Sequence, residues 1–147
     1  MDVGTHMIDL LRYFGGEISA ISGVMDSVVY KSEVDDFASA IVKFEKGGYG
    51  YFNVSFNSKK AFNRVEILGH KGALSIEKMI ANRHSPSKLT ILIDGEAKKS
   101  FRKRANKQLL LLKSVQRSFL KNEEPLVSGN EGLVNLQIME ELKRQCL

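Results

Sequence analysis

The sequence predicts an α+β fold, in which one antiparallel or mixed sheet carries helices on one face. Apolar residues recur at helical spacing near the start of the chain and again from about residue 104 onward. Between these segments, short alternating apolar runs are separated by glycine-containing turns, which predicts at least six strands. The short connections favour antiparallel neighbours, because a parallel pair needs a crossover of about a dozen residues or more.

The composition indicates one soluble globular domain over residues 1–147. The 147 residues are 43% hydrophobic and 27% charged, and a chain of this size can bury its own core. The one cysteine, Cys146, excludes an internal disulfide and a cysteine-based zinc cluster, and it favours a reducing, cytoplasmic setting. The sequence has no run of eighteen apolar residues and no basic-then-apolar leader, so we expect no membrane span and no signal peptide.

The first helix is expected from about Gly4 to Phe14, where ionisable groups, a glycine and an apolar stripe coincide. Asp2, His6 and Asp9 are three or four residues apart, so a helix groups two carboxylates around one imidazole. The glycine pair that follows ends the helix. Spacing alone leaves open that Asp2 is only a helix N-cap and that His6 only packs or faces solvent. The residues expected to anchor this helix in a core are Ile8, Leu11 and Phe14.

A strand and a hairpin are expected next. Residues 17–30 are rich in Ile, Val, Ser and Ala and predict a strand that Gly23 could interrupt. The clearest hairpin joins residues 37–44 to 49–56 through the turn Lys46-Gly47-Gly48. Its alternation predicts one core-facing side, formed by Ala38, Ala40, Val42, Phe44, Phe52, Val54 and Phe56.

A second hairpin and a further strand are expected in the middle of the chain. Residues 64–68 and 73–77 form the hairpin arms, and the two glycines between them suit a turn with positive φ. The further strand covers residues 89–93. We expect His70 to be exposed in the hairpin turn and His84 to lie in a loop, and neither is assigned a chemical role.

Two helices are expected after the strands, one over residues 104–121 and one at the C-terminus. An apolar stripe on the first predicts a core face. The basic cluster at its start and the net charge of +5 raise nucleic-acid binding as an alternative. The cluster lacks interleaved aromatic residues, so nucleic acid is not the favoured partner. The stripe is Ala105, Leu109, Leu112, Val115 and Phe119; the cluster is Arg102, Lys103, Arg104 and Lys107; the last helix carries Val134, Ile138 and Leu142.

The string Asp2-x-Gly4-x-His6-x-x-Asp9-Leu-Leu, followed by a glycine-ended helix, resembles a known family motif. It is similar to the opening of the second domain of the glucose-fructose oxidoreductase and inositol dehydrogenase family (Gfo/Idh/MocA). A proline-glycine loop at residues 125–129 before the last helix resembles the end of that domain. The resemblance therefore covers both ends of the chain.

The resemblance implies roles for the polar stripe. It places Asp2 and His6 on the substrate side of a nicotinamide cleft in an oxidoreductase that acts on a sugar, polyol or related hydroxyl. His6 would exchange a proton with the substrate hydroxyl, because histidine can gain or lose a proton near neutral pH. Asp2 would orient the imidazole or bind a hydroxyl. We interpret Asp9 as a supporting residue that bonds the backbone or a neighbouring side chain. The alternative is that Asp9 lies on a solvated face of the helix.

The resemblance also implies an open-faced sheet whose free face commonly forms a dimer contact. Tyr49 and Tyr51, followed on the same face by Asn53 and Ser55, would lie on that side and suit an interface rich in tyrosine. We therefore expect a homo-oligomer. Ordinary cross-strand aromatic packing is the alternative.

Two features of whole family members are missing from the sequence. There is no Gly-x-Gly-x-x-Gly after a strand and no Glu-Lys-Pro motif. The chain therefore resembles the second half of a longer protein, and we expect its partner to be an N-terminal dinucleotide-binding domain. NAD or NADP would be the cofactor of the full-length enzyme, with none bound by this chain alone. A non-catalytic binding or assembly module is the main alternative function.

Overall fold

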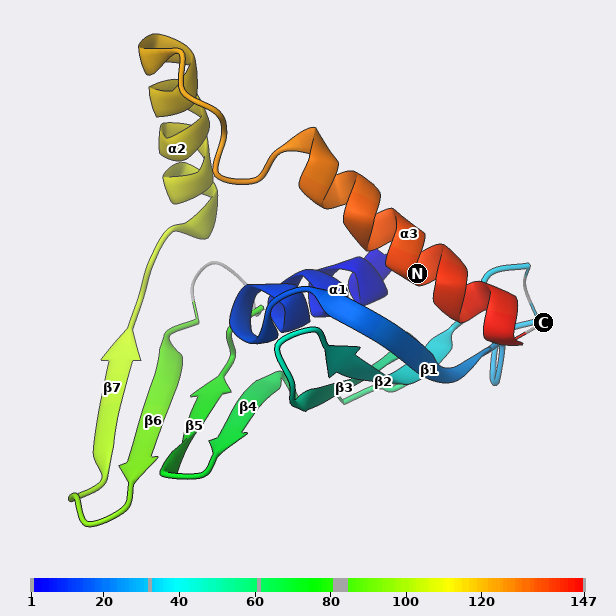
Figure 1. The fold of residues 1–147 in the computed structure, drawn as a ribbon, viewed down its shortest axis with the longest axis horizontal. Coiled ribbons are helices and arrows are strands. Elements are labelled where there is room, and N and C mark those ends of the chain that lie inside the picture. Colours follow the sequence, from blue (N-terminus) through cyan, green and yellow to red (C-terminus); the bar gives the residue numbers. More distant parts are fainter. Residues whose placement is uncertain (1, 32, 61, 81–84, 147) are drawn as a thin grey trace. The chain divides into compact units, whose positions relative to one another are not determined.

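The computed structural model describes residues 2–31, 33–60, 62–80 and 85–146. The described contacts group into two compact units. Unit 1 comprises Met1–Lys59 and Val127–Leu147, and unit 2 comprises Lys60–Leu126. Figure 1 shows the elements of both units, and each unit is described by itself.

Unit 1 is a three-stranded antiparallel sheet, in the order β1-β2-β3, with two helices on one face. The predicted hairpin is confirmed, since β2 pairs with β3 through the expected turn. β1 pairs with β2 along its length and passes through Gly23 without a break. The elements are α1 (Asp2–Gly15), β1 (Ile18–Asp26), β2 (Phe37–Phe44), β3 (Tyr49–Ser55) and α3 (Gly129–Cys146).

The core of unit 1 lies between this sheet and its helices. Ile8 of α1, Val42 of β2 and Leu142 of α3 are fully buried. Alternate residues of β2 face the core, as the sequence predicts, because successive side chains of a strand point to opposite faces. Two expected anchors are wrong: Phe14 and Phe56 are exposed. Instead of Phe14, helix α1 buries Arg12, which lies one turn after Ile8.

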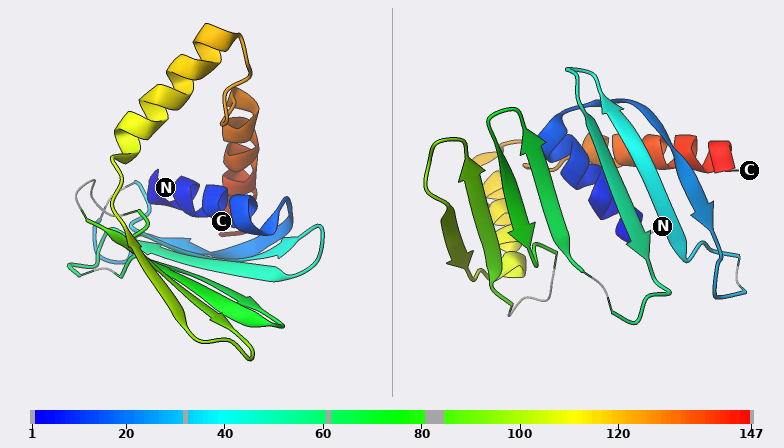
Figure 2. Two further views of the ribbon diagram at one scale, coloured as in Figure 1. Left: turned by 90° about the vertical axis from the view of Figure 1, so that its left-hand side faces the viewer. Right: turned by 90° about the horizontal axis from the view of Figure 1, so that it is seen from below.

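Unit 2 is a four-stranded antiparallel sheet in the order β4-β5-β6-β7, followed by α2. Figure 2 shows the strands of each sheet in sequence. The second hairpin is confirmed, with His70 exposed in its turn; His84 lies outside the described residues. The elements are β4 (Arg64–Gly69), β5 (Gly72–Glu77), β6 (Ser87–Ile93), β7 (Lys99–Lys103) and α2 (Lys107–Lys121).

Two expectations about the basic region of unit 2 are wrong. Arg102 and Lys103 belong to strand β7, which pairs with β6, rather than to the start of a helix. No residue of α2 is buried, so its apolar stripe is not a core face within unit 2. Side-chain pattern alone specifies a stripe but not whether a neighbour covers it.

Together the two open antiparallel sheets and the helices confirm the α+β fold class. One domain over residues 1–147 stays a prediction, and the described contacts group into the two units given above. Within the described residues, no helix is both long and apolar enough to cross a membrane.

Candidate functional site

Helix α1 carries the candidate site residues and lies along β2 and β3. Its first turn, at Gly4, shares a small pocket with Phe37 and Val54. Near its other end, Leu11 approaches Gly50, where an added Cβ would stand 2.7 Å from the Leu11 Cδ2 atom. Contacts at both ends therefore hold the helix against the sheet, and the missing side chain at Gly50 permits that approach.

The predicted site residues occupy the first half of α1. His6 is exposed. Asp2 begins α1, but its side chain lies outside the described residues. The Asp9 carboxylate accepts a hydrogen bond of 3.2 Å from Asn135 Nδ2 in α3. The carboxylate of Asp9 is thus held by the neighbouring helix α3.

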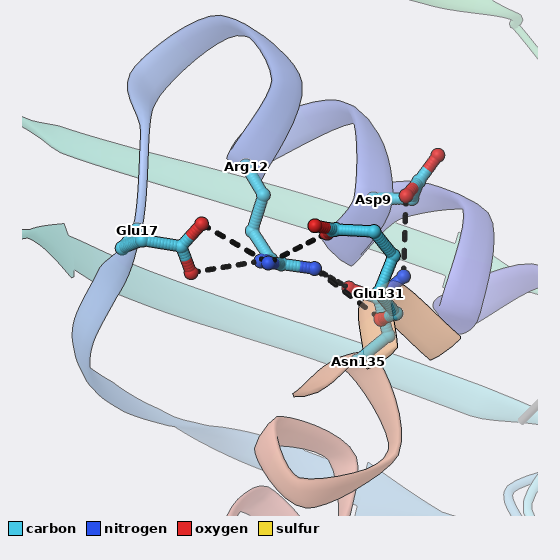
Figure 3. Close-up of polar contacts among 5 residues, drawn as sticks. All are labelled: Asp9, Arg12, Glu17, Glu131 and Asn135. Atoms are coloured by element: carbon cyan, nitrogen blue, oxygen red, sulfur yellow. Dashed lines mark hydrogen bonds and ion pairs between the residues drawn. The ribbon is translucent and has the colours of Figure 1, made fainter. Parts of the chain in front are cut away.

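A buried guanidinium one turn further along α1 fastens the helix (Figure 3). Arg12 forms a two-pronged contact with the Glu17 carboxylate, at 3.2 and 3.0 Å. It also contacts Glu131 Oε2 at 2.8 Å and donates to the Asn135 Oδ1 atom at 2.8 Å. Because Asn135 bonds both Arg12 and Asp9, one amide links two turns of α1 to α3. This network sets the position of α1 on the sheet.

The charge balance of this network favours a permanently charged arginine. Burial opposes the charge, but the hydrogen bond and charge of Glu17, and then those of Glu131, outweigh burial and raise the pKa of Arg12 above its ordinary value. The Arg12 side chain is 6% exposed, whereas those of Glu17 and Glu131 are 55% and 46% exposed. The Arg12 guanidinium is therefore enclosed, whereas the Glu17 and Glu131 carboxylates reach solvent.

The sequence interpretation missed Arg12. The available signal was a cation four residues after the buried Ile8, within the apolar stripe, with Glu17 just beyond the glycine pair. A charge on the buried side of a helix requires a partner. Glu131 and Asn135 could not be named in this way, because they lie more than a hundred residues away in the sequence.

Asp36 organises the sheet end that lies near the first turn of α1. Its buried carboxylate accepts hydrogen bonds from the backbone N–H groups of Tyr30 (2.8 Å), Val29 (2.8 Å) and Val28 (2.9 Å). Asn57 adds a fourth, at 3.0 Å. Because the three backbone N–H groups bond Asp36, they do not bond a neighbouring strand. This explains why β1 ends at Asp26 and not at the predicted residue 30.

The hydrogen bonds to Asp36 favour its ionised form. The backbone N–H of Tyr30, followed by those of Val28 and Val29 and the amide of Asn57, lowers the pKa of the carboxyl despite the opposing effect of burial. A charged Asp36 therefore fixes the segment after β1 next to the sheet end where α1 begins.

The closely spaced glycines of the described residues lie in a hairpin turn, and these residues contain no cluster of metal ligands. Gly47 and Gly48 have φ angles of 91° and 93° and form the turn between β2 and β3. A phosphate cradle instead needs glycines between a strand and the start of a helix. No group of three or more His, Cys, Asp or Glu residues in the described ranges could hold a metal ion.

A family model described as the GFO/IDH/MocA C-terminal domain matches residues 1–75, half of the chain. The chain belongs to the GFO/IDH/MocA C-terminal domain family. The match spans α1, the β1–β3 sheet and most of the β4–β5 hairpin, and so includes the helix with Asp2, His6 and Asp9. A search of curated proteins finds no match.

Three solved structures with a similar fold are named as oxidoreductases, dehydrogenases or reductases. An aldose-aldose oxidoreductase from Caulobacter crescentus, complexed with glycerol, has a TM-score of 0.82 and 22% identity over 97% of this chain. The WlbA dehydrogenase from Bordetella pertussis, in complex with NADH and UDP-GlcNAcA, has a TM-score of 0.75 and 19% identity over 97%. A 3-ketoreductase from Actinomadura kijaniata, in complex with NADP, has a TM-score of 0.79 and 14% identity over 99%.

This GFO/IDH/MocA C-terminal domain spans less than half of each of these proteins. The matched share is 43% of the Caulobacter chain, 40% of the Bordetella chain and 46% of the Actinomadura chain. At these identities the likeness concerns the fold alone.

Proposed function

We propose that this chain is the substrate-binding and oligomerisation half of an NAD(P)-dependent oxidoreductase acting on a sugar, polyol or related hydroxyl. The observation that carries the proposal is the placement of an exposed His6 on a helix held by a buried ion-pair network, within a matched family segment. The similar structures include an aldose-aldose oxidoreductase and complexes with NADH or NADP, which supports this class.

His6 is the proposed catalytic residue. Its exposed imidazole, on an element held in place from behind, would take the proton from a substrate hydroxyl or return it. Asp2, one turn before His6, would orient the imidazole or bind a second hydroxyl. Asp9, bonded to Asn135, supports the helix from behind and does not touch substrate in this proposal.

The cofactor belongs to a separate dinucleotide-binding domain in this proposal. NAD or NADP would be bound there, because the described residues lack the strand-glycine-helix cradle. This chain then contributes the substrate side of the cleft. The upstream genomic sequence offers a direct check: a glycine fingerprint and a Glu-Lys-Pro motif in the same or the adjacent reading frame support a divided or longer enzyme.

The test requires that domain to be supplied, as the natural partner chain or as a fused upstream domain. His6→Ala should then lower turnover by about 10²- to 10⁴-fold, the usual contribution of a general acid-base group. His70→Ala, which changes an exposed turn residue, is the matched control and should leave turnover unchanged. Melting temperatures of both variants check folding. Normal turnover in a folded His6→Ala enzyme would remove His6 from the mechanism.

A further inference from the structure

Asn135 is a polar residue at a core position of helix α3. Its exposed fraction is 4%, and Leu142, which lies two helical turns further along α3, is fully buried in the core of unit 1. Residues seven apart share one side of a helix, so an apolar side chain at position 135 would face the same core. A buried amide costs free energy unless its hydrogen bonds are made. Asn135 therefore indicates contacts that an apolar side chain could not supply.

The amide of Asn135 fits between its two partners in one orientation (Figure 3). Its Oδ1 atom accepts a hydrogen bond of 2.8 Å from Arg12 Nη1, and its Nδ2 atom donates one of 3.2 Å to Asp9 Oδ1. A guanidinium only donates and a carboxylate only accepts, so a reversed amide would lose both bonds. Asn135 thus contacts two turns of α1 through different atoms, and the contact with Asp9 can be changed separately from the contact with Arg12.

Polar contacts between α1 and α3 form one seam, along which residue numbers rise in α1 as they fall in α3. These contacts join Thr5 Oγ1 to Met139 Sδ at 3.1 Å, Asp9 Oδ1 to Asn135 Nδ2, and Arg12 Nη2 to Glu131 Oε2 at 2.8 Å. The contact with Asn135 is in the middle of the seam. His6 lies between Thr5 and Asp9 in the sequence, so the helical turn that carries the imidazole begins and ends at contacts with α3. A slide of α1 by one residue, about 1.5 Å, would break the bonds of Asn135.

We propose that Asn135 is a positioning residue for His6, because its amide fixes the half of α1 that carries the imidazole against α3. This inference rests on the proposed function, in which His6 exchanges a proton with the substrate hydroxyl. Proton transfer requires the two groups to come within hydrogen-bond reach, and a misplacement of about 1 Å can lower a rate by about 10²-fold. Asn135 does not contact the substrate in this inference and acts through Asp9 and the helix.

Exchanging the two polar groups separates position from general stability. Asn135→Asp keeps an acceptor for Arg12 but places a second carboxylate next to Asp9, so the bond in the middle of the seam is lost. The double variant Asp9→Asn with Asn135→Asp restores both bonds, because the new amide at position 9 donates to the new carboxylate at position 135. Gln137→Glu makes the same amide-to-acid change at an exposed position of α3 and is the control.

Hydrogen exchange of this chain alone measures how firmly the helix is held. In Asn135→Asp, the amides of residues 6–10 should exchange at least about tenfold faster than in the parent, because the first half of α1 opens locally. The double variant should restore slow exchange, and Gln137→Glu should keep it. Unchanged exchange in Asn135→Asp would overturn the inference. So would an equal acceleration in β2, since that result would mean a general loss of stability.

Turnover tests the link to His6 once the dinucleotide-binding domain is supplied. Asn135→Asp should lower kcat at least about tenfold and leave KM nearly unchanged, because misplacing His6 weakens only the transition state. The double variant should recover kcat. Parent-like kcat in Asn135→Asp, or recovery of slow exchange without recovery of kcat, would overturn the inference and leave the proposed function standing. A parent enzyme without turnover would count against the proposed function, whereas the exchange measurements would still decide whether Asn135 holds α1.

Discussion

At the scale of single residues, two enclosed charges determine how unit 1 is held together. Arg12 joins α1, α3 and the segment before β1 through Glu17, Glu131 and Asn135. Asp36 holds the backbone after β1 through four hydrogen bonds. In both cases several polar partners surround one buried ion, as a charge removed from water requires.

Replacing Arg12 should destabilise the chain. Arg12→Met leaves the Asn135 carbonyl without its donor and places the Glu17 and Glu131 carboxylates side by side without a cation, so the free energy of unfolding should fall by about 2 to 3 kcal/mol. Urea denaturation monitored by circular dichroism measures the change. Arg144→Met is the control, since Arg144 is 70% exposed and pairs with Glu141 on the surface; it should cost about 1 kcal/mol or less. Equal losses in the two variants would contradict the role of the network.

Asp36 should make stability depend on acid pH. Its pKa in the folded chain lies below the ordinary value of about 3.9 for an unfolded aspartate. The stabilisation is therefore complete above that unfolded value and is lost as the pH falls through the lower folded value. Asp36→Asn should lower the melting temperature at neutral pH and make it fall less steeply as the pH drops below about 4.

Thermal melts across that pH range test the Asp36 prediction. Asp94→Asn, in the exposed turn after β6, is the control and should follow the parent chain. If the melting temperatures of the parent and the Asp36→Asn chain fall in parallel with pH, the folded chain does not specially stabilise the ionised Asp36 carboxyl.

At the scale of elements, close backbone approach limits which residues fit in the strands. At Gly23, an added Cβ would overlap the carbonyl oxygen of Ser39 on β2. At Gly50, an added Cβ would press on Leu11 of α1. The first glycine lets β1 and β2 pair closely, and the second lets α1 pack on β3.

Gly23→Ala should therefore destabilise the sheet. The overlap is with backbone atoms, which cannot move aside as a flexible side chain can, and overpacking of this kind costs about 1 to 3 kcal/mol. Gly132→Ala in α3 is the control, because an added Cβ meets nothing within 4 Å there. That change should stabilise by up to about 1 kcal/mol through helix propensity. Chemical denaturation of the two variants gives the comparison, and an unaffected Gly23→Ala chain would contradict the tight pairing.

At the scale of the whole molecule, the open face of the β1–β3 sheet is the surface on which we expect self-association. Ile41, Tyr49 and Tyr51 are 62%, 75% and 74% exposed there, and they line a shallow hollow together with Ser39. Tyrosine and isoleucine on one exposed face suit an interface better than solvent. The core-facing side of the same sheet is already covered by α1 and α3.

The chain should accordingly be a dimer or larger by light scattering. Ile41→Glu with Tyr51→Glu should weaken association at least about tenfold, since central interface residues commonly contribute more than 1 kcal/mol each. Tyr13→Glu changes an aromatic that is 79% exposed on α1 and serves as the control. A strictly monomeric parent chain at high concentration would argue against this interface.

The sequence by itself determined the helix with Asp2, His6 and Asp9, both central hairpins and the buried face of β2. These features depend on local spacing and turn chemistry, which neighbouring residues specify together. It did not determine strand β7, whose five residues carry one apolar side chain and become a strand by pairing with β6.

Only the tertiary structure decided which polar groups meet and which apolar stripes are covered. Arg12 and Glu131 are 119 residues apart, so their contact depends on how α1 and α3 pack on one sheet. Likewise, the stripes of α2 and of α3 look alike in sequence, yet Leu142 is fully buried and Phe119 is exposed. Hydrophobic periodicity specifies the direction in which a helix presents its apolar side, whereas burial depends on whether another element occupies that side.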